Sequence, residues 1–307
     1  MEMARICATK KPAATMIFAA TAGEEQGLFG SAHLAQTLKQ AGANVEGNWN
    51  NDIVGTGSSQ PFAPINQYTI RLFGASIVYP NATTASNIRT TAIVGGENDS
   101  PARNLGRYIS EIAAGAARYV NMQVALIYRP DRFLRGGDHE SFLAQGFPAV
   151  RFTEAVEDFA HQHQDPRVQD GIQYGDLVEY VDFEYVTRVA RVNLASMWSA
   201  ANAPAMPRNV TVSELVGTTA QSESSPIEEL SNDARFFWNH PGNDSLLAGY
   251  ELVWRPSGAL QWTHSLSVGN VSTATVHLSK DDVQFGIRAV GQDGKKSPAV
   301  FPLPVYA

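Results

Sequence analysis

Two adjacent glutamates, Glu24 and Glu25, follow the strongly apolar run at residues 15–22 after a single glycine, Gly23. A carboxylate at the end of a buried strand loses its hydration, and a metal, a cation or a substrate must offset this loss. Neighbouring side chains on an irregular turn point in different directions, so one glutamate can bind a metal while the other acts on a substrate. The pair therefore indicates metal-assisted hydrolysis, although a solvated loop after a strand would contain the same residues.

A third carboxylate, Asp52, belongs to the end of the next predicted strand, residues 45–54. In an open α/β sheet, ligands bind outside the carboxyl ends of the strands. We therefore expect Glu24, Glu25 and Asp52 to share one crevice. Three carboxylates this close repel one another unless a cation neutralises them, which again favours a metal.

Two later segments carry further residues suited to such a site. Asp138 and His139 lie in the glycine-rich segment 136–142, and Glu154 follows the predicted strand 148–152. These three residues are further candidates for the site.

The segment at residues 161–165 reads His-Gln-His-Gln-Asp, with His161 first and Asp165 last. Histidine is the commonest metal ligand where a site exists, but a single loop histidine is more often structural or solvated. Two histidines two residues apart do not share one face of a helix. The pattern therefore disfavours a helical two-histidine site and leaves a ligand in a loop as the alternative.

Apolar runs alternate with helical patterns up to about residue 200, which is typical of a mainly parallel sheet flanked by helices. Helical spacing predicts helices over residues 31–41, from Pro101 onward, and from Asp182 to about residue 201. Asp99 or Ser100 is expected to cap the second helix and Asp182 the third. The strands are expected at residues 15–20, 45–54, 68–73, 122–128 and 148–152.

The pattern changes after residues 203–207, a proline-rich linker, from helical to alternating. Short strands separated by Gly, Asn, Asp and Ser turns are typical of a small antiparallel β-sandwich. We therefore predict an α/β domain at 1–202, the linker, and an all-β sandwich at 208–307. The sandwich strands are expected at residues 209–215, 234–238, 250–255, 273–278 and 283–290.

Four motifs in order resemble the M28 zinc aminopeptidases. They are GEEQGLFGS at 23–31, NNDIVG at 50–55, GGDHESFLAQGFPAVRFTE at 136–154 and HQHQD at 161–165. The resemblance implies a zinc exopeptidase type of α/β fold, with a mainly parallel sheet flanked by helices. The segments GYELVWR at 249–255 and VQFGIRAVGQDGKKSP at 283–298 resemble a fibronectin type III module.

The resemblance implies a role for each matching residue. Glu24 matches the general base that takes a proton from a metal-bound water, and Glu25 matches a zinc ligand. Asp52 matches a ligand of the second zinc ion, and His161 matches the final ligand, which shares a metal with Glu25. Contacts to the ligands or to the substrate are expected from four further residues, Asp138, His139, Glu154 and Asp165.

One family feature is absent from this sequence. Family members carry a His-x-Asp motif upstream, which supplies a terminal ligand and the aspartate that bridges both metals. Residues 1–22 contain neither His nor Asp. The resemblance therefore implies an N-terminally incomplete chain, with a signal peptide in the missing part and two zinc ions only in the complete protein. We expect this chain to bind two metals poorly, and its own activity is left open.

Composition excludes several classes of protein. The net charge of -7 argues against a nucleic-acid binder, whose footprint would be a basic patch. No apolar run reaches the length of about 20 residues that a membrane-spanning helix needs. The single cysteine, Cys7, excludes a disulfide within the chain. Four Asn-x-Ser/Thr sequons, at Asn81, Asn209, Asn243 and Asn270, mildly support a secreted protein.

The leading hypothesis is a secreted zinc-dependent exopeptidase that cleaves N-terminal residues from peptides, an aminopeptidase. A non-catalytic peptidase-like binding protein is the alternative from another class, which the missing His-x-Asp favours and the intact Glu24 and Glu25 oppose. A carboxypeptidase or a glutaminyl-cyclase-like relative on the same sheet is a third reading.

Overall fold

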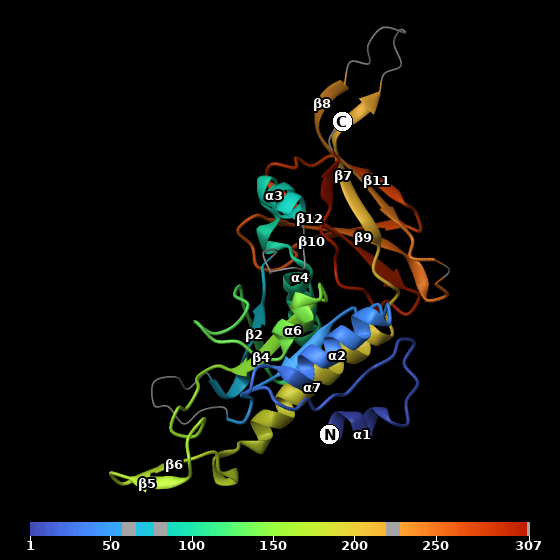
Figure 1. Cartoon of the computed structure of the whole chain (residues 1–307). Coiled ribbons are helices and arrows are strands. Elements are labelled where there is room, and N and C mark those ends of the chain that lie inside the picture. The colour runs from blue at the N-terminus through green and yellow to red at the C-terminus, as the bar shows by residue number, and fades with distance from the viewer. Residues whose placement is uncertain (57–65, 77–84, 219–227, 243, 306–307) are drawn as a thin grey trace. The chain divides into compact units, whose positions relative to one another are not determined.

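The computed structural model describes residues 1–56, 66–76, 85–218, 228–242 and 244–305 (Figure 1). Two of the four sequons, Asn81 and Asn243, lie outside these residues. The chain forms two compact units. The first comprises Met1–Lys11, Met16–Ala75 and Ile109–Trp198, and the second comprises Pro12–Thr15, Ser76–Tyr108 and Ser199–Ala307. The domain limits expected from the sequence stay a prediction.

The first unit contains a mixed sheet of four strands in the order β1-β4-β2-β3. Two of the three strand pairs, β1 with β4 and β2 with β3, are parallel, and β2 and β4 are antiparallel. The expected α/β class with a mainly parallel sheet is therefore confirmed. The strands are β1 (Asn48–Asn51), β2 (Thr69–Gly74), β3 (Gln123–Ile127) and β4 (Ala149–Glu154).

Helical spacing predicted the long helices correctly, and their caps form as expected. Ser100 Oγ accepts a hydrogen bond of 3.1 Å from the backbone N–H of Arg103, and Asp182 Oδ1 accepts one of 2.9 Å from Tyr185. Three helices, α3, α5 and α6, were not predicted. The helices are α1 (Glu2–Cys7), α2 (Phe29–Gln40), α3 (Ala85–Ile93), α4 (Pro101–Gly115), α5 (Ala117–Val120), α6 (His139–Ala144) and α7 (Phe183–Ala201).

Polar side chains fasten α7 to β1 within the first unit. The amides of Asn51 and Asn193 exchange two hydrogen bonds of 2.9 Å, and Trp49 Nε1 donates to Ser196 Oγ at 3.0 Å. Helix α6 contacts α2, β1 and β4, and its Ser141 lies 2.9 Å from Ser31 of α2. These contacts fix the carboxyl end of β1 and the start of α6, where several candidate site residues lie.

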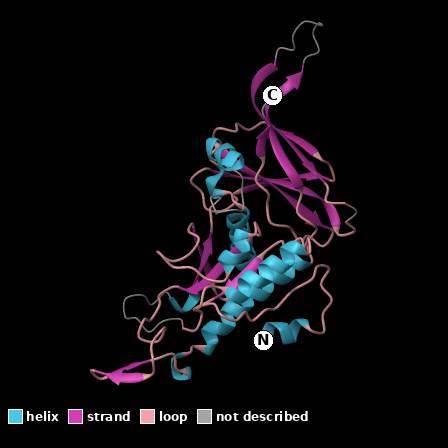
Figure 2. Cartoon of the chain, in the orientation of Figure 1, coloured by secondary structure: helices cyan, strands magenta, loops and turns pink. Residues whose placement is uncertain are grey.

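The first strand expected from the sequence, residues 15–20, does not form. Figure 2 shows the stretch between α1 and α2 as loop, and Ile17 and Phe18 are 55% and 37% exposed. An apolar run becomes a strand only when a neighbouring strand pairs with it, and no strand in the described part of the chain does so. A short antiparallel hairpin, β5 (Arg167–Gln169) with β6 (Ile172–Tyr174), was in turn not predicted.

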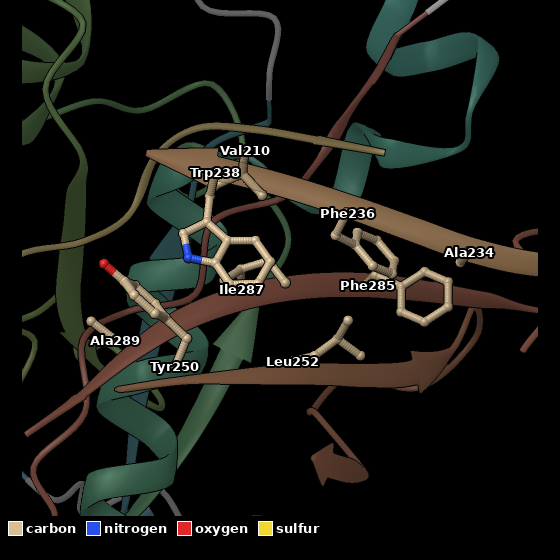
Figure 3. Close-up of a cluster of buried hydrophobic side chains, with 9 residues drawn as sticks. All are labelled: Val210, Ala234, Phe236, Trp238, Tyr250, Leu252, Phe285, Ile287 and Ala289. Atoms are coloured by element: carbon tan, nitrogen blue, oxygen red, sulfur yellow. The ribbon is translucent and has the colours of Figure 1, made fainter. Parts of the chain in front are cut away.

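The second unit contains the expected sandwich, with sheets of three and four strands in the orders β10-β9-β12 and β11-β8-β7-β13. Side chains from both sheets form one core, in which Trp238 packs edge-on against Tyr250 and Phe236 against Phe285 (Figure 3). Two strands, β10 and β13, were not predicted. The strands are β7 (Arg208–Thr218), β8 (Glu228–Asn239), β9 (Leu247–Pro256), β10 (His264–Gly269), β11 (Thr273–Val276), β12 (Val283–Gly291) and β13 (Leu303–Val305).

A buried ion network joins the segment before α4 to the sandwich inside the second unit. Asp99 accepts from Arg107 at 3.0 Å and from Arg255 of β9 at 2.7 Å, and these three side chains are at most 1% exposed. Both guanidinium groups also lie over the ring of Trp262. The sandwich therefore shares a polar core with residues 99–107.

None of the helices in the described residues has the length and apolar character that a membrane span requires.

The network around Asp99 predicts a large effect of a small substitution. Asp99→Asn leaves two buried guanidinium groups without their anion, which should lower the free energy of unfolding by about 3–5 kcal/mol. Urea denaturation of the chain measures this loss. Asp293→Asn, which removes an exposed ion pair with Lys295, is the matched control and should cause no measurable change. Equal stability of both variants would show that the buried network contributes nothing.

Candidate metal-binding active site

A tight loop before α2 presents the two adjacent glutamates. The carbonyl of Glu24 accepts hydrogen bonds from the backbone N–H groups of Gly27 and Leu28, at 3.0 and 2.9 Å. Gly30 must be a glycine because a Cβ there would lie 2.5 Å from the carbonyl oxygen of Ala22. The loop leaves Glu24 half-buried and Glu25 exposed.

Glu25 faces a histidine, His163, from the segment between β4 and β5. Its Oε1 lies 2.8 Å from Nε2 of His163, and both side chains are 64% exposed. His163 has a left-handed backbone, with φ of 54°. The family resemblance pairs Glu25 with His161, the first histidine of the motif. In the structure it is the second histidine, His163, that contacts Glu25.

The neighbouring His161 has other partners. Its Nδ1 donates to the carbonyl oxygen of Gly175 at 3.1 Å, and its ring stacks on Tyr180 with the centroids 3.6 Å apart. The Nε2 atom lies 3.8 Å from Oδ2 of Asp158. Asp165 has an exposed side chain, and its carbonyl accepts from Arg167. The ligand role expected for His161 stays a prediction.

Asp52 directly follows β1 and is tied to a wholly buried arginine of β4. Asp52 Oδ2 lies 3.0 Å from Nη2 of Arg151, and the Asp52 side chain is 32% exposed. Arg151 also donates to Asp131 at 2.8 Å. Neither Arg151 nor Asp131 was singled out from the sequence.

Asp138 and His139 lie at the start of α6. Asp138 Oδ2 accepts from the hydroxyl of Thr21 at 2.5 Å, and its buried Oδ1 has no hydrogen-bond partner among the described residues. Nε2 of His139 donates to the carbonyl of Pro130 at 2.8 Å. Burial lowers the pKa of His139 well below its ordinary value. His139 is therefore a neutral, wholly buried side chain.

The carboxylates of this region act on one another. Burial raises the pKa of Glu24, and the charges of Asp52, Glu25 and Asp138 raise it further, while Arg151 opposes them. The pKa of Asp52 is also raised, chiefly by burial. A group of carboxylates that destabilise one another's charges is stabilised by a bound cation, so the electrostatics favour a metal or an ammonium group.

Glu154 ends β4 and is almost completely buried, with an exposed fraction of 3%. Its Oε2 accepts from the backbone N–H of Thr56 at 2.9 Å. Burial raises the pKa of Glu154 to about 7, and the charge of Glu157 adds to this effect. Glu157 itself pairs with Arg71 and Arg132, and these partners lower its pKa.

The donor types in this region fit zinc, which binds carboxylate oxygen and imidazole nitrogen. Glu25 and His163 form a hydrogen-bonded ion pair at 2.8 Å and carry one donor of each of these types. The described residues nevertheless contain no group of three or more His, Cys, Asp or Glu side chains arranged to hold a metal. A catalytic zinc normally has three protein ligands. The described residues therefore provide the chemistry of a zinc site but only part of its ligands.

Residues 1–179 match the family described as Peptidase family M28. A protein of Pyricularia oryzae named "Probable zinc metalloprotease" is 52% identical over 312 residues, which cover 99% of this chain and 58% of that protein. A protein of Pyrenophora tritici-repentis with the same name is 50% identical over 304 residues, covering 99% and 59%. The chain thus spans about three fifths of the length of these relatives. A zinc aminopeptidase from Bacillus subtilis matches with a TM-score of 0.39 and 18% identity, over 65% of this chain and 39% of that structure.

The raised pKa of Glu154 predicts a pH-dependent stability. Because the folded state prefers the protonated form, stability should fall as the pH rises from 4.5, the ordinary pKa, through about 7. Glu154→Gln mimics that form and should abolish this loss. The difference in free energy of unfolding between the variant and the wild type should therefore change with pH. From acid to about pH 8 it should shift in favour of the variant by on the order of 3 kcal/mol. Urea denaturation at both pH values measures this.

Glu157→Gln serves as the control with the opposite sign. In the wild type the pKa of Glu157 is lowered, so the ion pairs of Glu157 stabilise the fold above the ordinary pKa and are lost in acid. This variant should be less stable than the wild type at about pH 8 and should approach it as the pH falls. A parallel response of both variants would contradict the protonation assigned to Glu154.

Proposed function

Since the chain belongs to peptidase family M28, we propose that it carries the general base and part of the zinc site of a metallopeptidase that removes N-terminal residues from peptides. The observation that supports this most directly is the approach of Glu25 and His163, 2.8 Å apart, beside the half-buried Glu24. A ligand pair next to a carboxylate that bonds to neither of them is the arrangement that metal-assisted hydrolysis needs.

In this proposal the chain's own residues divide the chemistry. A zinc ion, when bound, polarises the scissile carbonyl and increases the acidity of the attacking water. Glu25 and His163 hold the ion, and Asp52 provides a further carboxylate ligand for a second one. Glu24 accepts the proton of the attacking water and returns it to the leaving amine. Its raised pKa makes it a stronger base than an ordinary glutamate.

The acidic surroundings also suit the substrate end that an aminopeptidase recognises. The α-ammonium group of a peptide is a cation, and Glu24, Asp52 and Asp138 repel one another in its absence. We propose peptides with a free N-terminus as substrates and an extracellular site of action. Two sequons in the described part of the chain, at Asn209 and Asn270, are exposed, which is compatible with secretion.

Zinc binding distinguishes the two histidines of the 161–165 motif. His163→Ala should weaken binding of zinc to the chain by more than about tenfold, because it removes one of the two facing donors. His161→Ala, the matched control, should leave zinc affinity nearly unchanged, since its ring is held by Gly175 and Tyr180. Calorimetric titration with the metal alone measures both. A larger loss in His161→Ala would favour the ligand assignment that the family resemblance implies.

Removal of the base should separate catalysis from metal binding. Glu24→Gln should lower the rate of hydrolysis of an aminoacyl nitroanilide by about 10²–10⁴-fold, because proton transfer is lost. Zinc content, measured by elemental analysis, should not change. Glu184→Gln, an exposed glutamate of α7, is the control and should retain full activity.

The assay is carried out on this chain and on a form extended to the length of the relatives. Activity that survives in Glu24→Gln would refute the assignment of the base. Absence of hydrolysis from both wild-type forms, with zinc retained, would favour the non-catalytic binding protein.

A further inference from the structure

We infer that Arg151 is a positioning residue, which fixes the carboxylate of Asp52 in the candidate site. Arg151 lies in β4 with no exposed surface. A buried guanidinium is stable only when anions and hydrogen-bond acceptors surround it, so its partners are strongly specified. The consequence for zinc rests on the function proposed above, whereas the pairing itself does not.

Each nitrogen of the guanidinium has a partner of its own. Nε donates to Thr153 Oγ1 at 3.0 Å, and Nη1 donates to Asp131 Oδ2 at 2.8 Å and to the carbonyl of Gly136. Nη2 has no hydrogen bond of good geometry but forms the ion pair with Asp52 at 3.0 Å. Arg151 is therefore already satisfied by Asp131 and Gly136, and its remaining donor group is directed to Asp52.

Asp52 is held at its backbone as well. The hydroxyl of Thr153 donates to the Asp52 carbonyl at 3.1 Å, and the Asp52 N–H donates to the carbonyl of Phe152 at 3.2 Å. Three successive residues of β4 thus hold Asp52, and Arg151 is the one that reaches its side chain. The ion pair uses Oδ2, which leaves Oδ1 available to a ligand.

The arrangement around Arg151 also explains why residue 137 is a glycine. A Cβ at Gly137 would lie 2.5 Å from Nη1 of Arg151 and 3.3 Å from Oδ2 of Asp52. Asp131 is fixed from its other side, because its Oδ1 accepts from the backbone N–H and from Nε of Arg132. The guanidinium therefore occupies the space that a side chain at position 137 would need, and its partner Asp131 is held in place, so the ion pair with Asp52 depends on this packing.

A purely structural role would predict a different result from a positioning role. An arginine that merely neutralises Asp131 would affect stability without affecting what Asp52 does. If Arg151 positions Asp52, removing Arg151 weakens zinc binding in the same way as removing Asp52. The two losses of affinity then do not add. The test is therefore a double-mutant cycle with two readouts, the affinity for zinc and the equilibrium constant of unfolding.

The cycle comprises Arg151→Met, Asp52→Asn and the double variant in the 307-residue chain. Each single variant should weaken zinc binding, measured calorimetrically with the metal alone, by about 10–100-fold, and the double variant no more than either. Arg151→Lys should recover part of the affinity, because the lysine keeps the positive charge. The recovery should be incomplete, because its single ammonium group can reach only one of the partners. Arg107→Met, another buried arginine in an ion pair, is the control and should reduce stability without changing zinc affinity.

Several outcomes would overturn the inference. Additive losses, or full zinc affinity in Arg151→Met when Asp52→Asn loses it, would show that Arg151 does not position Asp52. If Asp52→Asn itself leaves zinc affinity unchanged, the ligand role of Asp52 in the proposed function fails. The pairing is then judged by urea unfolding alone, where a coupling below about twofold in the equilibrium constant refutes it.

A second variant covers the case that Arg151→Met does not fold. Gly137→Ala keeps every charge but intrudes on Nη1 of Arg151 and on the Asp52 carboxylate. It should weaken zinc binding in the wild type and have no further effect in Asp52→Asn. An equal effect in both backgrounds would contradict the inference.

Discussion

The candidate site depends on one buried guanidinium that has to be neutralised without water. Arg151 is the cation of β4, and it fastens the residue after β1, Asp52, and the loop after β3, which contains Asp131 and Gly136. These three segments are far apart in the sequence and meet because a guanidinium offers several donors in a fixed plane. The requirement extends to Gly137, since any side chain there would displace the group.

Arg151 neutralises the carboxylates of the candidate site only in part. Arg151 opposes the charges on Glu24 and Asp52, but burial outweighs it and the pKa of both carboxylates stays raised. Asp138 keeps a buried oxygen without a partner among the described residues. Glu24 and Asp52 therefore carry their negative charges at a cost in free energy. A bound cation would reduce this cost, which supports the ligand site proposed above.

The sequence predicted what depends on local physics. Helical spacing and side-chain caps identified α2, α4 and α7, and Ser100 and Asp182 cap as expected because each bonds only three residues ahead. The strand at residues 15–20 failed because pairing is a non-local condition that an apolar run cannot guarantee. The position of His163 beside Glu25 depends on a left-handed backbone within a loop, which no spacing rule reveals. Arg151 did leave a signal, since a charged residue inside the apolar run 148–152 requires a buried anion.

Each unit contains a buried network of arginine and aspartate, and the exposure of the aspartates distinguishes the two networks. In the second unit two arginines share one aspartate, all three side chains are buried, and the excess positive charge lies over the ring of Trp262. In the first unit Arg151 lies between Asp131, which also pairs with Arg132, and Asp52, which is 32% exposed. The closed arrangement around Asp99 stabilises a fold. The arrangement around Arg151 is open on the side of Asp52, and under the function proposed above this is where a ligand would reach the carboxylate.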